Sequence, residues 1–406
     1  MSSSDGSIER RLRALVGPDG QMTTDDDGTP NVAPSTATGC ALVLRTASAE
    51  GWRVRIVGNG SWIPPDAPAE LTLSSRGLGQ VEDVHAADLV ATVQSGVDQH
   101  ALREALADRG TWWPVDAPGD RRSVGSLVAT ATAGPLRSGF GNIRDHLLGL
   151  TIVTADGHIL NYGGRVAKNV AGFDLTKLAT GSFGAFGFIS SVHLRLRPIP
   201  RADATLTTND RRDALLGQGQ AILDAGITPS ALELLSPVAG STDDWTLGVR
   251  LIGSDATVEA ERAAVAAACT ARWTSLSSRN AADFWRDAQQ RATQHATTIR
   301  VGCVITGLRQ AINLVLHHLD DATITASIGA GVVRWSGSAS AARLQLLRRT
   351  AAQVEMPVTI ERAPWPLRNE LGHFGLCRKG VNRLMGSLRH TFDPQSTLTV
   401  ALAGRS

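Results

Sequence analysis

The sequence has 406 residues, of which 42% are hydrophobic and 19% charged, and its formal net charge is +2. This length suits two or three domains. The nearly balanced charge gives no electrostatic reason to expect nucleic acid or an anionic membrane as a partner. No apolar run reaches the length of a membrane-spanning helix, and the first residues lack a signal-peptide core. Four scattered cysteines without a Cys-x-x-Cys pair favour a reducing compartment.

The first 33 residues are polar and uneven, so we expect a flexible N-terminal segment over 1–33 with an exposed acidic run at 25–28. Ordered structure is expected from about Pro34, with a strand over 53–57. That strand runs into the turn Gly58-Asn59-Gly60-Ser61. Free backbone N–H groups in such a turn accept anions, but the same residues also form ordinary tight turns. The turn by itself leaves both interpretations open.

The most unusual stretch is 163–197, in which Gly181, Gly184 and Gly187 precede an apolar, alternating run typical of a strand. Glycines at such positions allow the backbone to approach something closely. Further glycine-rich loops occur between residues 58 and 145, and several of them can converge on one elongated ligand. No Gly-x-Gly-x-x-Gly opens a helix after the first strand, which argues against a Rossmann fold.

The second half has a different pattern. Residues 201–230 contain prolines and a charged run and are expected to be a linker. Strands and helices then alternate over 231–375, which suits an antiparallel sheet with helices on one face. A helix and tail are expected over 376–406. The fold class is therefore α+β.

Five motifs show a resemblance to the FAD-binding oxidases of the vanillyl-alcohol-oxidase (PCMH) type. They are RIVGNGS at 55–61, PVD at 114–116 with SVGS at 123–126, SGFGNIRDHLLG at 138–149, KNVAGFDL at 168–175, and GSFGAFGFI at 181–189. Their order and spacing resemble the family over about residues 35–200. The resemblance implies a two-part FAD-binding domain over 34–200 and a smaller cap domain over 231–375. Within the family, the sequence is most similar to the FAD-binding subunits of bacterial glycolate oxidases.

The resemblance also implies which residues bind FAD. Small residues and backbone N–H groups would contact the pyrophosphate from the first two loops, and the later loops would run beside the flavin and the adenine. These residues are Val57, Gly58, Asn59, Gly60, Ser61, Pro118, Ser123, Val124, Gly125, Ser126, Ser138, Gly139, Asn142, Ile143, Arg144, Asp145, Gly184, Gly187 and Ile189.

The sequence departs from the family pattern at three places. Asn59 and Ser126 stand where relatives carry glycine, and the Asn-Pro-Gly expected after Phe392-Asp393-Pro394 is missing. Covalently flavinylated relatives carry a histidine in the first loop, and none occurs at 58–62. We therefore expect FAD to be bound without a covalent bond.

Oxidation of a 2-hydroxy acid needs a hydride acceptor, a base for the hydroxyl proton and a cation for the carboxylate. The His-rich metal motif of catalytic relatives is absent, and His317-His318 cannot both chelate one ion because adjacent helical side chains diverge. No metal site is predicted. Lys168, Arg300, Arg334 and His373 are candidates for catalysis, although a solvated or salt-bridging role is the simpler interpretation of each.

The resemblance implies an FAD-binding subunit of a glycolate oxidase complex that oxidises glycolate to glyoxylate. Its partners would be a sister FAD-linked catalytic subunit and an iron–sulfur subunit. The chain would lie in the cytoplasm, free or at the inner face of the membrane through its complex. Two alternatives stay open: a self-sufficient FAD-linked oxidoreductase for another hydroxy acid or alcohol, and a scaffold subunit that has lost FAD.

Overall fold

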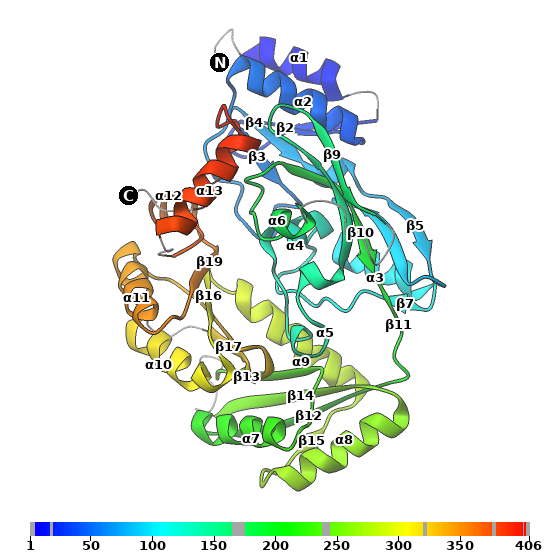
Figure 1. The fold of residues 1–406 in the computed structure, drawn as a ribbon, viewed down its shortest axis with the longest axis vertical. Coiled ribbons are helices and arrows are strands. Elements are labelled where there is room, and N and C mark those ends of the chain that lie inside the picture. Colours follow the sequence, from blue (N-terminus) through cyan, green and yellow to red (C-terminus); the bar gives the residue numbers. More distant parts are fainter. Residues whose placement is uncertain are drawn as a thin grey trace.

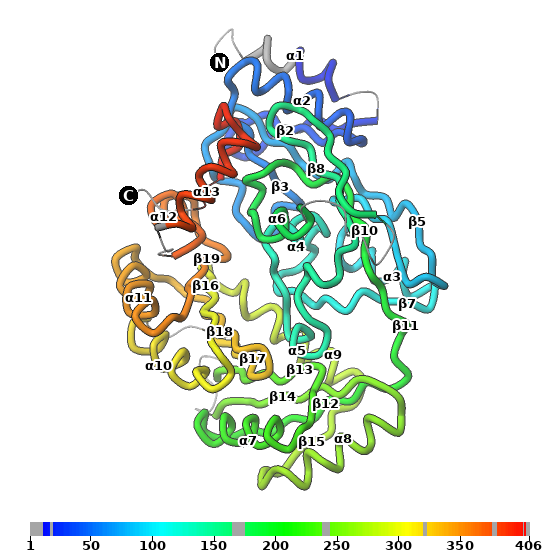
Figure 2. Tube along the Cα trace, in the orientation of Figure 1, coloured from blue at the N-terminus to red at the C-terminus, as the bar shows by residue number. Residues whose placement is uncertain are grey.

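The computed structural model describes residues 5–16, 19–164, 175–237, 244–319, 323–375, 379–400 and 402. Figure 1 shows two parts. An N-terminal lobe comprises residues 5–200 together with the C-terminal segment 379–402, and a cap comprises residues 201–375. The chain runs from the lobe into the cap and returns to the lobe at its end, as the colours of Figure 2 show. No helix of the described residues is long and apolar enough to cross a membrane.

The lobe begins with a four-stranded sheet in the order β1-β2-β4-β3. Its strands are β1 (Gln21–Thr24), β2 (Pro30–Ala33), β3 (Val54–Val57) and β4 (Leu71–Ser74). Helices α1 (Asp5–Val16) and α2 (Ala37–Glu50) pack on it through one hydrophobic cluster. Thr36 caps α2 by accepting from the Gly39 N–H at 3.0 Å, and Gly51 ends it in the left-handed conformation.

A second sheet of five strands has the order β5-β6-β10-β8-β9. Its strands are β5 (Val81–His85), β6 (Val90–Gln94), β8 (Leu147–Val153), β9 (Ile159–Gly163) and β10 (Phe188–Arg195). The helices of this region are α3 (Gln99–Ala107), α4 (Val124–Thr130), α5 (Arg137–Phe140) and α6 (Leu175–Ala179). β7 (Thr111–Trp112) and β11 (Arg197–Pro198) pair before the chain enters the cap.

The N-terminal segment differs from the expectation that residues 1–33 are flexible. Its described part forms α1, β1 and β2, because the turn between β1 and β2 covers a buried arginine. Arg55 is 3% exposed, and its guanidinium pairs with Asp25 at 2.8 Å and Asp27 at 3.0 Å. The hydrogen bond from Arg55 lowers the pKa of Asp27 to about 2. The acidic run that looks like a solvated turn is thus the counter-charge of a buried cation.

The cap is built on an eight-stranded antiparallel sheet in the order β15-β12-β14-β13-β17-β18-β16-β19. Its strands are β12 (Ala202–Asp210), β13 (Ala231–Leu235), β14 (Trp245–Gly253), β15 (Thr274–Ser275), β16 (Thr297–Gly302), β17 (Thr323–Ser327), β18 (Val332–Gly337) and β19 (Val358–Arg362). This sheet confirms the expected α+β class with an antiparallel cap.

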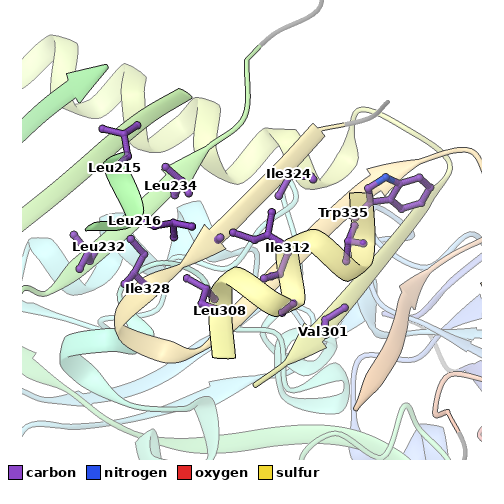
Figure 3. Packing of buried hydrophobic residues seen from close by; sticks show 14 of the residues in the cluster. Leu215, Leu216, Leu232, Leu234, Val301, Leu308, Ile312, Ile324, Ile328 and Trp335 are labelled. Carbon is purple, nitrogen blue, oxygen red and sulfur yellow. The ribbon is translucent and has the colours of Figure 1, made fainter. Parts of the chain in front are cut away.

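One face of the cap sheet carries four helices, α7 (Arg212–Asp224), α8 (Asp255–Ala268), α10 (Leu308–His318) and α11 (Ala341–Gln353). Their apolar residues share one core with the sheet, in which Leu215, Leu234 and Ile312 lie close together (Figure 3). Helix α9 (Ser278–Gln290) packs on the opposite face, where Trp285 contacts a second cluster with Ala231 and Leu235.

Residues 201–230, expected to be a linker, instead form β12 and α7 and belong to the cap. β12 pairs with β14 along its whole length, from Ala202 opposite Gly253 to Asp210 opposite Trp245. The sequence of β12 is mostly polar, with Leu206 as its buried hydrophobic residue. Strand pairing rather than a clear apolar alternation therefore determines this element.

The expected C-terminal helix is α13 (Lys379–Phe392), and α12 (Trp365–Leu371) precedes it. Met385, Leu388 and Phe392 pack against the core of the lobe. The Asp393 carboxylate accepts from the N–H groups of Thr397 and Leu398 at 2.7 and 2.9 Å, which turns the chain back. Leu398 then pairs with Val54 of β3. The Phe-Asp-Pro element thus anchors the end of the chain without the missing Asn-Pro-Gly.

The buried Arg55 gives a first prediction. Arg55→Met leaves Asp25, which is 18% exposed, without its cation, and removal of one partner of a largely buried pair costs about 3 kcal/mol or more. Urea unfolding should show this loss, and hydrogen exchange should localise it to residues 21–33. Arg53→Met is the matched control immediately before the same strand, because its pair with Glu70 is exposed and should contribute at most about 1 kcal/mol. Equal losses in both variants would contradict the assignment.

Candidate functional site

A cavity of about 970 Å³, counting the open space at its mouth, lies in the N-terminal lobe and is bordered by the cap. The turn after β3, helix α4 and the loop before β10 line it from the lobe. Arg368 and His373 line it from the cap, and Thr399 and Val400 from the C-terminal segment. Three stretches far apart in the sequence therefore build one site.

The cavity brings together about half of the residues expected to bind FAD. These lining residues are Val57, Gly58, Asn59, Gly60, Ser61, Gly125, Ser126, Gly184, Gly187 and Ile189. The other expected residues, which are described but do not line this cavity, are Pro118, Ser123, Val124, Ser138, Gly139, Asn142, Ile143, Arg144 and Asp145.

Several of these other residues have structural contacts instead. The Ser123 hydroxyl caps α4, since it accepts from the Ser126 N–H at 3.3 Å. The Gly139 N–H donates to the Ser230 carbonyl at 3.1 Å, so this loop contacts the cap. The Asp145 carboxylate accepts from the Asn142 N–H at 2.8 Å within a turn.

The other expected residues outside the cavity lining differ in burial and in their contacts. Val124 and Ile143 are buried, and Arg144 is exposed beside Asp145. The Pro118 carbonyl accepts from Arg122, and the Ser138 hydroxyl is buried without a partner in the described chain. The motif 168–174, including Lys168, lies outside the described residues.

Two glycines are required by close approach. A Cβ at Gly58 would lie 2.3 Å from the Ser123 Oγ, and one at Gly125 would lie 2.7 Å from the Ser95 Cβ. The first turn, α4 and β6 therefore meet with no room for side chains between them. Asn59 does not obstruct this arrangement, because its side-chain amide donates to the Arg121 carbonyl at 2.9 Å.

Three buried polar atoms in the wall of the cavity have no hydrogen-bond partner in the described chain. They are the Trp62 Nε1, the Ser75 Oγ and the Ser95 Oγ. Buried polar groups normally have partners, since an unsatisfied one costs free energy. An elongated ligand with many polar atoms, such as FAD, fits a cavity with such a wall. Trp62 ends the glycine-rich turn that begins at Gly58, whereas Ser75 and Ser95 lie outside the five motifs, so the sequence does not single them out.

His373, a candidate from the sequence, lines the cavity and stacks on Phe183 with ring centroids 3.9 Å apart. Its Nδ1 lies 2.7 Å from the Ile360 carbonyl, which only accepts, so Nδ1 carries the proton. Burial lowers the pKa of His373 to about 4. The ring is therefore neutral near pH 7 and presents Nε2 as a hydrogen-bond acceptor.

Arg300 and Arg334 lie on the face of the cap sheet that looks toward the N-terminal lobe. They are opposite each other on β16 and β18, and Glu361 of β19 lies between their guanidiniums. Arg334 donates to Glu361 at 2.8 Å and to the Ala133 carbonyl of the lobe at 2.7 Å. Arg334 thus joins the two parts of the molecule, whereas Arg300 shares the same carboxylate at 3.1 Å.

Arg137 of α5 approaches this pair from the lobe. Burial, together with the nearby charges of Arg300 and Arg334, lowers its pKa to about 10. We call Arg137, Arg300 and Arg334 around Glu361 the cationic cluster. Two more buried carboxyls lie near it. Burial raises the pKa of Glu233 to about 8, which keeps it protonated at neutral pH, and that of Asp116 to about 6, which leaves it mostly ionised. With Glu361 and Asp116 facing three guanidiniums, the positive charge still exceeds the negative charge.

Within the described ranges, no three His, Cys, Asp or Glu side chains are placed to hold a metal ion. The rings of His317 and His318 lie 4.9 Å apart at about a right angle on α10.

Residues 31–163 match the family model described as the FAD binding domain. The chain is 35% identical to the glycolate oxidase subunit GlcE of Escherichia coli over 178 residues, which are 43% of this chain and 48% of that protein. It is 30% identical to the glycolate oxidase subunit GlcD of Bacillus subtilis over 250 residues, 56% of this chain and 53% of that protein. A probable mitochondrial D-lactate dehydrogenase of Danio rerio is 36% identical over 170 residues, 41% of this chain and 34% of that protein.

The chain thus spans about half or less of the length of these curated relatives. Over nearly its whole length it has the fold of a solved structure of alkyldihydroxyacetonephosphate synthase. The TM-score is 0.71 at 16% identity, and the match covers 98% of this chain and 86% of that one. The family model confirms that residues 31–163, which contain the first three glycine-rich motifs, match an FAD binding domain.

Proposed function

We propose that this protein binds FAD without a covalent bond and takes part in the oxidation of a small 2-hydroxy acid, with glycolate as the first candidate. The observation that carries the proposal is the cavity, whose wall contains buried polar atoms without hydrogen-bond partners in the described chain. A cationic cluster lies at the boundary between the cap and the same lobe. The relatives named as glycolate oxidase subunits and D-lactate dehydrogenases support the same substrate class.

The proposed cofactor contacts follow from the lining of the cavity. Backbone groups of Gly58–Ser61 and the hydroxyls of Ser75, Ser95 and Ser126 face the polar parts of FAD, and His373 accepts a hydrogen bond through Nε2. When bound, FAD supplies the two-electron acceptor for the hydride of the substrate C–H bond. The low pKa of His373 makes it a poor base, so we assign it to binding rather than to proton abstraction.

The proposed anchor for the substrate carboxylate is Arg300 together with Arg137. Arg334 is occupied by Glu361 and by the Ala133 carbonyl. Arg300, by contrast, has only a share of the Glu361 carboxylate, which also pairs with Arg334. No side-chain hydrogen bond of Arg137 is found in the described chain. A guanidinium fork matches a carboxylate in geometry and charge. With the carboxylate held there, the substrate hydride would pass to FAD and its hydroxyl proton to water, which gives the 2-oxo acid.

We further propose that the protein works as a subunit of a complex with a sister FAD-linked catalytic subunit and an iron–sulfur subunit. Two relatives are named as glycolate oxidase subunits, which supports assembly into a complex. The presence of a complete cap with its own cationic cluster favours the alternative of a self-sufficient oxidoreductase. A scaffold without FAD is less well supported, because the Asn59 side chain is bonded to Arg121 and leaves the turn open.

A flavin spectrum tests the proposal. The purified protein, incubated with FAD, should show flavin absorbance. Denaturation should release all of the flavin and leave none covalently attached to the chain. Glycolate added without oxygen should bleach it, either with the protein alone or only with the partner subunits. Bleaching by the protein alone would remove the need for a catalytic partner. A protein that stays colourless would overturn FAD binding and favour the scaffold.

A second prediction concerns the fit of the cofactor loops. Gly125→Ala places a methyl group 2.7 Å from the Ser95 Cβ, so α4 must shift away from β6 and the cavity changes shape. Titration with FAD should show a dissociation constant at least about tenfold weaker, equivalent to about 1.4 kcal/mol. Gly217→Ala on α7 is the control, because its added Cβ meets nothing within 4 Å. Unchanged FAD affinity in Gly125→Ala would show that FAD binds elsewhere.

A third prediction concerns substrate binding. Arg300→Met removes one proposed charge-assisted contact, for which about 2 kcal/mol, or roughly 30-fold in kcat/KM, is expected. Glu361 keeps Arg334 as its partner, so the variant should fold and bind FAD normally. Anaerobic flavin reduction at varied glycolate measures the effect. Arg309→Met, which removes an exposed pair with Asp213, should behave like the wild type. A loss of FAD affinity with unchanged reduction kinetics would contradict the assignment.

A further inference from the structure

Two neighbouring helices of the cap, α10 and α11, carry apolar side chains on their outer surface (Figure 1). Their inner faces pack on the sheet, where Leu308 and Ile312 of α10 enter the core (Figure 3). On the outside, Leu316 of α10 is 41% exposed and Leu346 of α11 is 53% exposed. Large apolar side chains that gather on one exposed surface are typical of sites that bind a partner.

The two helices run antiparallel, with a groove between them. The Arg343 guanidinium at the start of α11 donates to the His318 carbonyl at the end of α10 at 2.9 Å. Leu346 lies one turn before Thr350 and therefore on the same face of α11. The groove is lined by Thr350 and, on α10, by two leucines and two histidines, Leu314, Leu316, His317 and His318.

The surface around the groove is positively charged. Neither helix contains an aspartate or a glutamate. Arg349 is exposed three residues after Leu346. Burial, together with the nearby charges of His317 and Arg343, lowers the pKa of His318. The His318 Nε2 is also buried without a hydrogen-bond partner among the described residues. A carboxylate of an occupant would balance the positive charge and accept a hydrogen bond from Nε2.

A protein fits this surface better than a lipid membrane does. Anionic membranes attract clusters of lysine and arginine, and helices that lie on them commonly carry tryptophan. α10 and α11 contain no lysine and no tryptophan, and one of their four arginines, Arg348, is buried. A groove between two helices instead matches an elongated segment with apolar side chains at regular intervals.

We propose that the groove between α10 and α11 is the docking site for a partner subunit, which presents an acidic segment with leucine-like side chains. The apolar side chains of this segment cover Leu316 and Leu346, and its carboxylates face Arg349 and His318. Charge guides the approach, and burial of the leucines supplies most of the affinity. The inference rests on the proposed membership of a complex. It does not involve the cofactor cavity, because neither helix lines that cavity.

Coexpression with the sister FAD-linked subunit and the iron–sulfur subunit tests the docking site. The tagged wild type should copurify with at least one of them, and the affinity should fall as the salt concentration rises. Leu346→Ser and Arg349→Glu should each weaken the complex at least about tenfold. Both variants should keep the flavin spectrum of the wild type, since neither residue lines the cavity. Arg262→Glu, which reverses an exposed charge on α8, should assemble like the wild type.

Four results would overturn the inference. Unchanged affinity in Leu346→Ser and Arg349→Glu would remove the docking site and leave the proposed complex in place. A wild type that copurifies with neither subunit would remove both, while the flavin spectrum would still decide FAD binding. A wild type that dimerises alone and becomes monomeric as Leu346→Ser would assign the groove to a second copy of the chain. Binding to phosphatidylserine vesicles that is lost in Arg349→Glu would assign it to a membrane.

Discussion

The structure depends on one buried carboxylate, Glu361, which lies between two arginines of the cap sheet. Arg300 and Arg334 are cross-strand neighbours, and like charges in that arrangement repel. Glu361 accepts from both, and nearby positive charge keeps its pKa below the usual value despite burial. Arg334, held in this way, reaches the Ala133 carbonyl of the N-terminal lobe. The same ion pair therefore orders the cap sheet and joins it to the lobe.

Strand alternation explains why charge gathers at this boundary. On β16, β18 and β19 the residues between the charged ones, such as Ile299, Val333 and Ile360, enter the helix-covered core. The charged residues must then face the lobe. Because Glu361 is one carboxylate against several guanidiniums, the boundary retains positive charge. An excess of this kind suits an anionic ligand, and the proposed anchor for the substrate carboxylate rests on it.

The glycine-rich motifs could be interpreted from the sequence because their function is local. At Gly58 and Gly125 the backbone comes too close to a neighbour for a side chain. Glycines of this kind can be recognised in the sequence because they lie within short glycine-rich motifs. The loop at 138–145 has the same appearance but contacts the cap through Gly139 and Ser230. A glycine requires close approach, yet it does not reveal whether a ligand or another part of the chain lies beside it.

The sequence by itself determined the α+β class and the antiparallel cap, because these depend on local periodicity. Its glycine-rich motifs resembled those of a known family, and that resemblance implied the FAD binding domain, which the family model then matched over residues 31–163. Only the tertiary structure decided which charges are buried. Arg55 lies 30 residues from Asp25, and Arg334 lies 201 residues from Ala133. Ser75 and Ser95 line the cavity without belonging to any of the five motifs. Burial and pairing of polar groups arise from contacts between distant segments, and a linear pattern contains no measure of those distances.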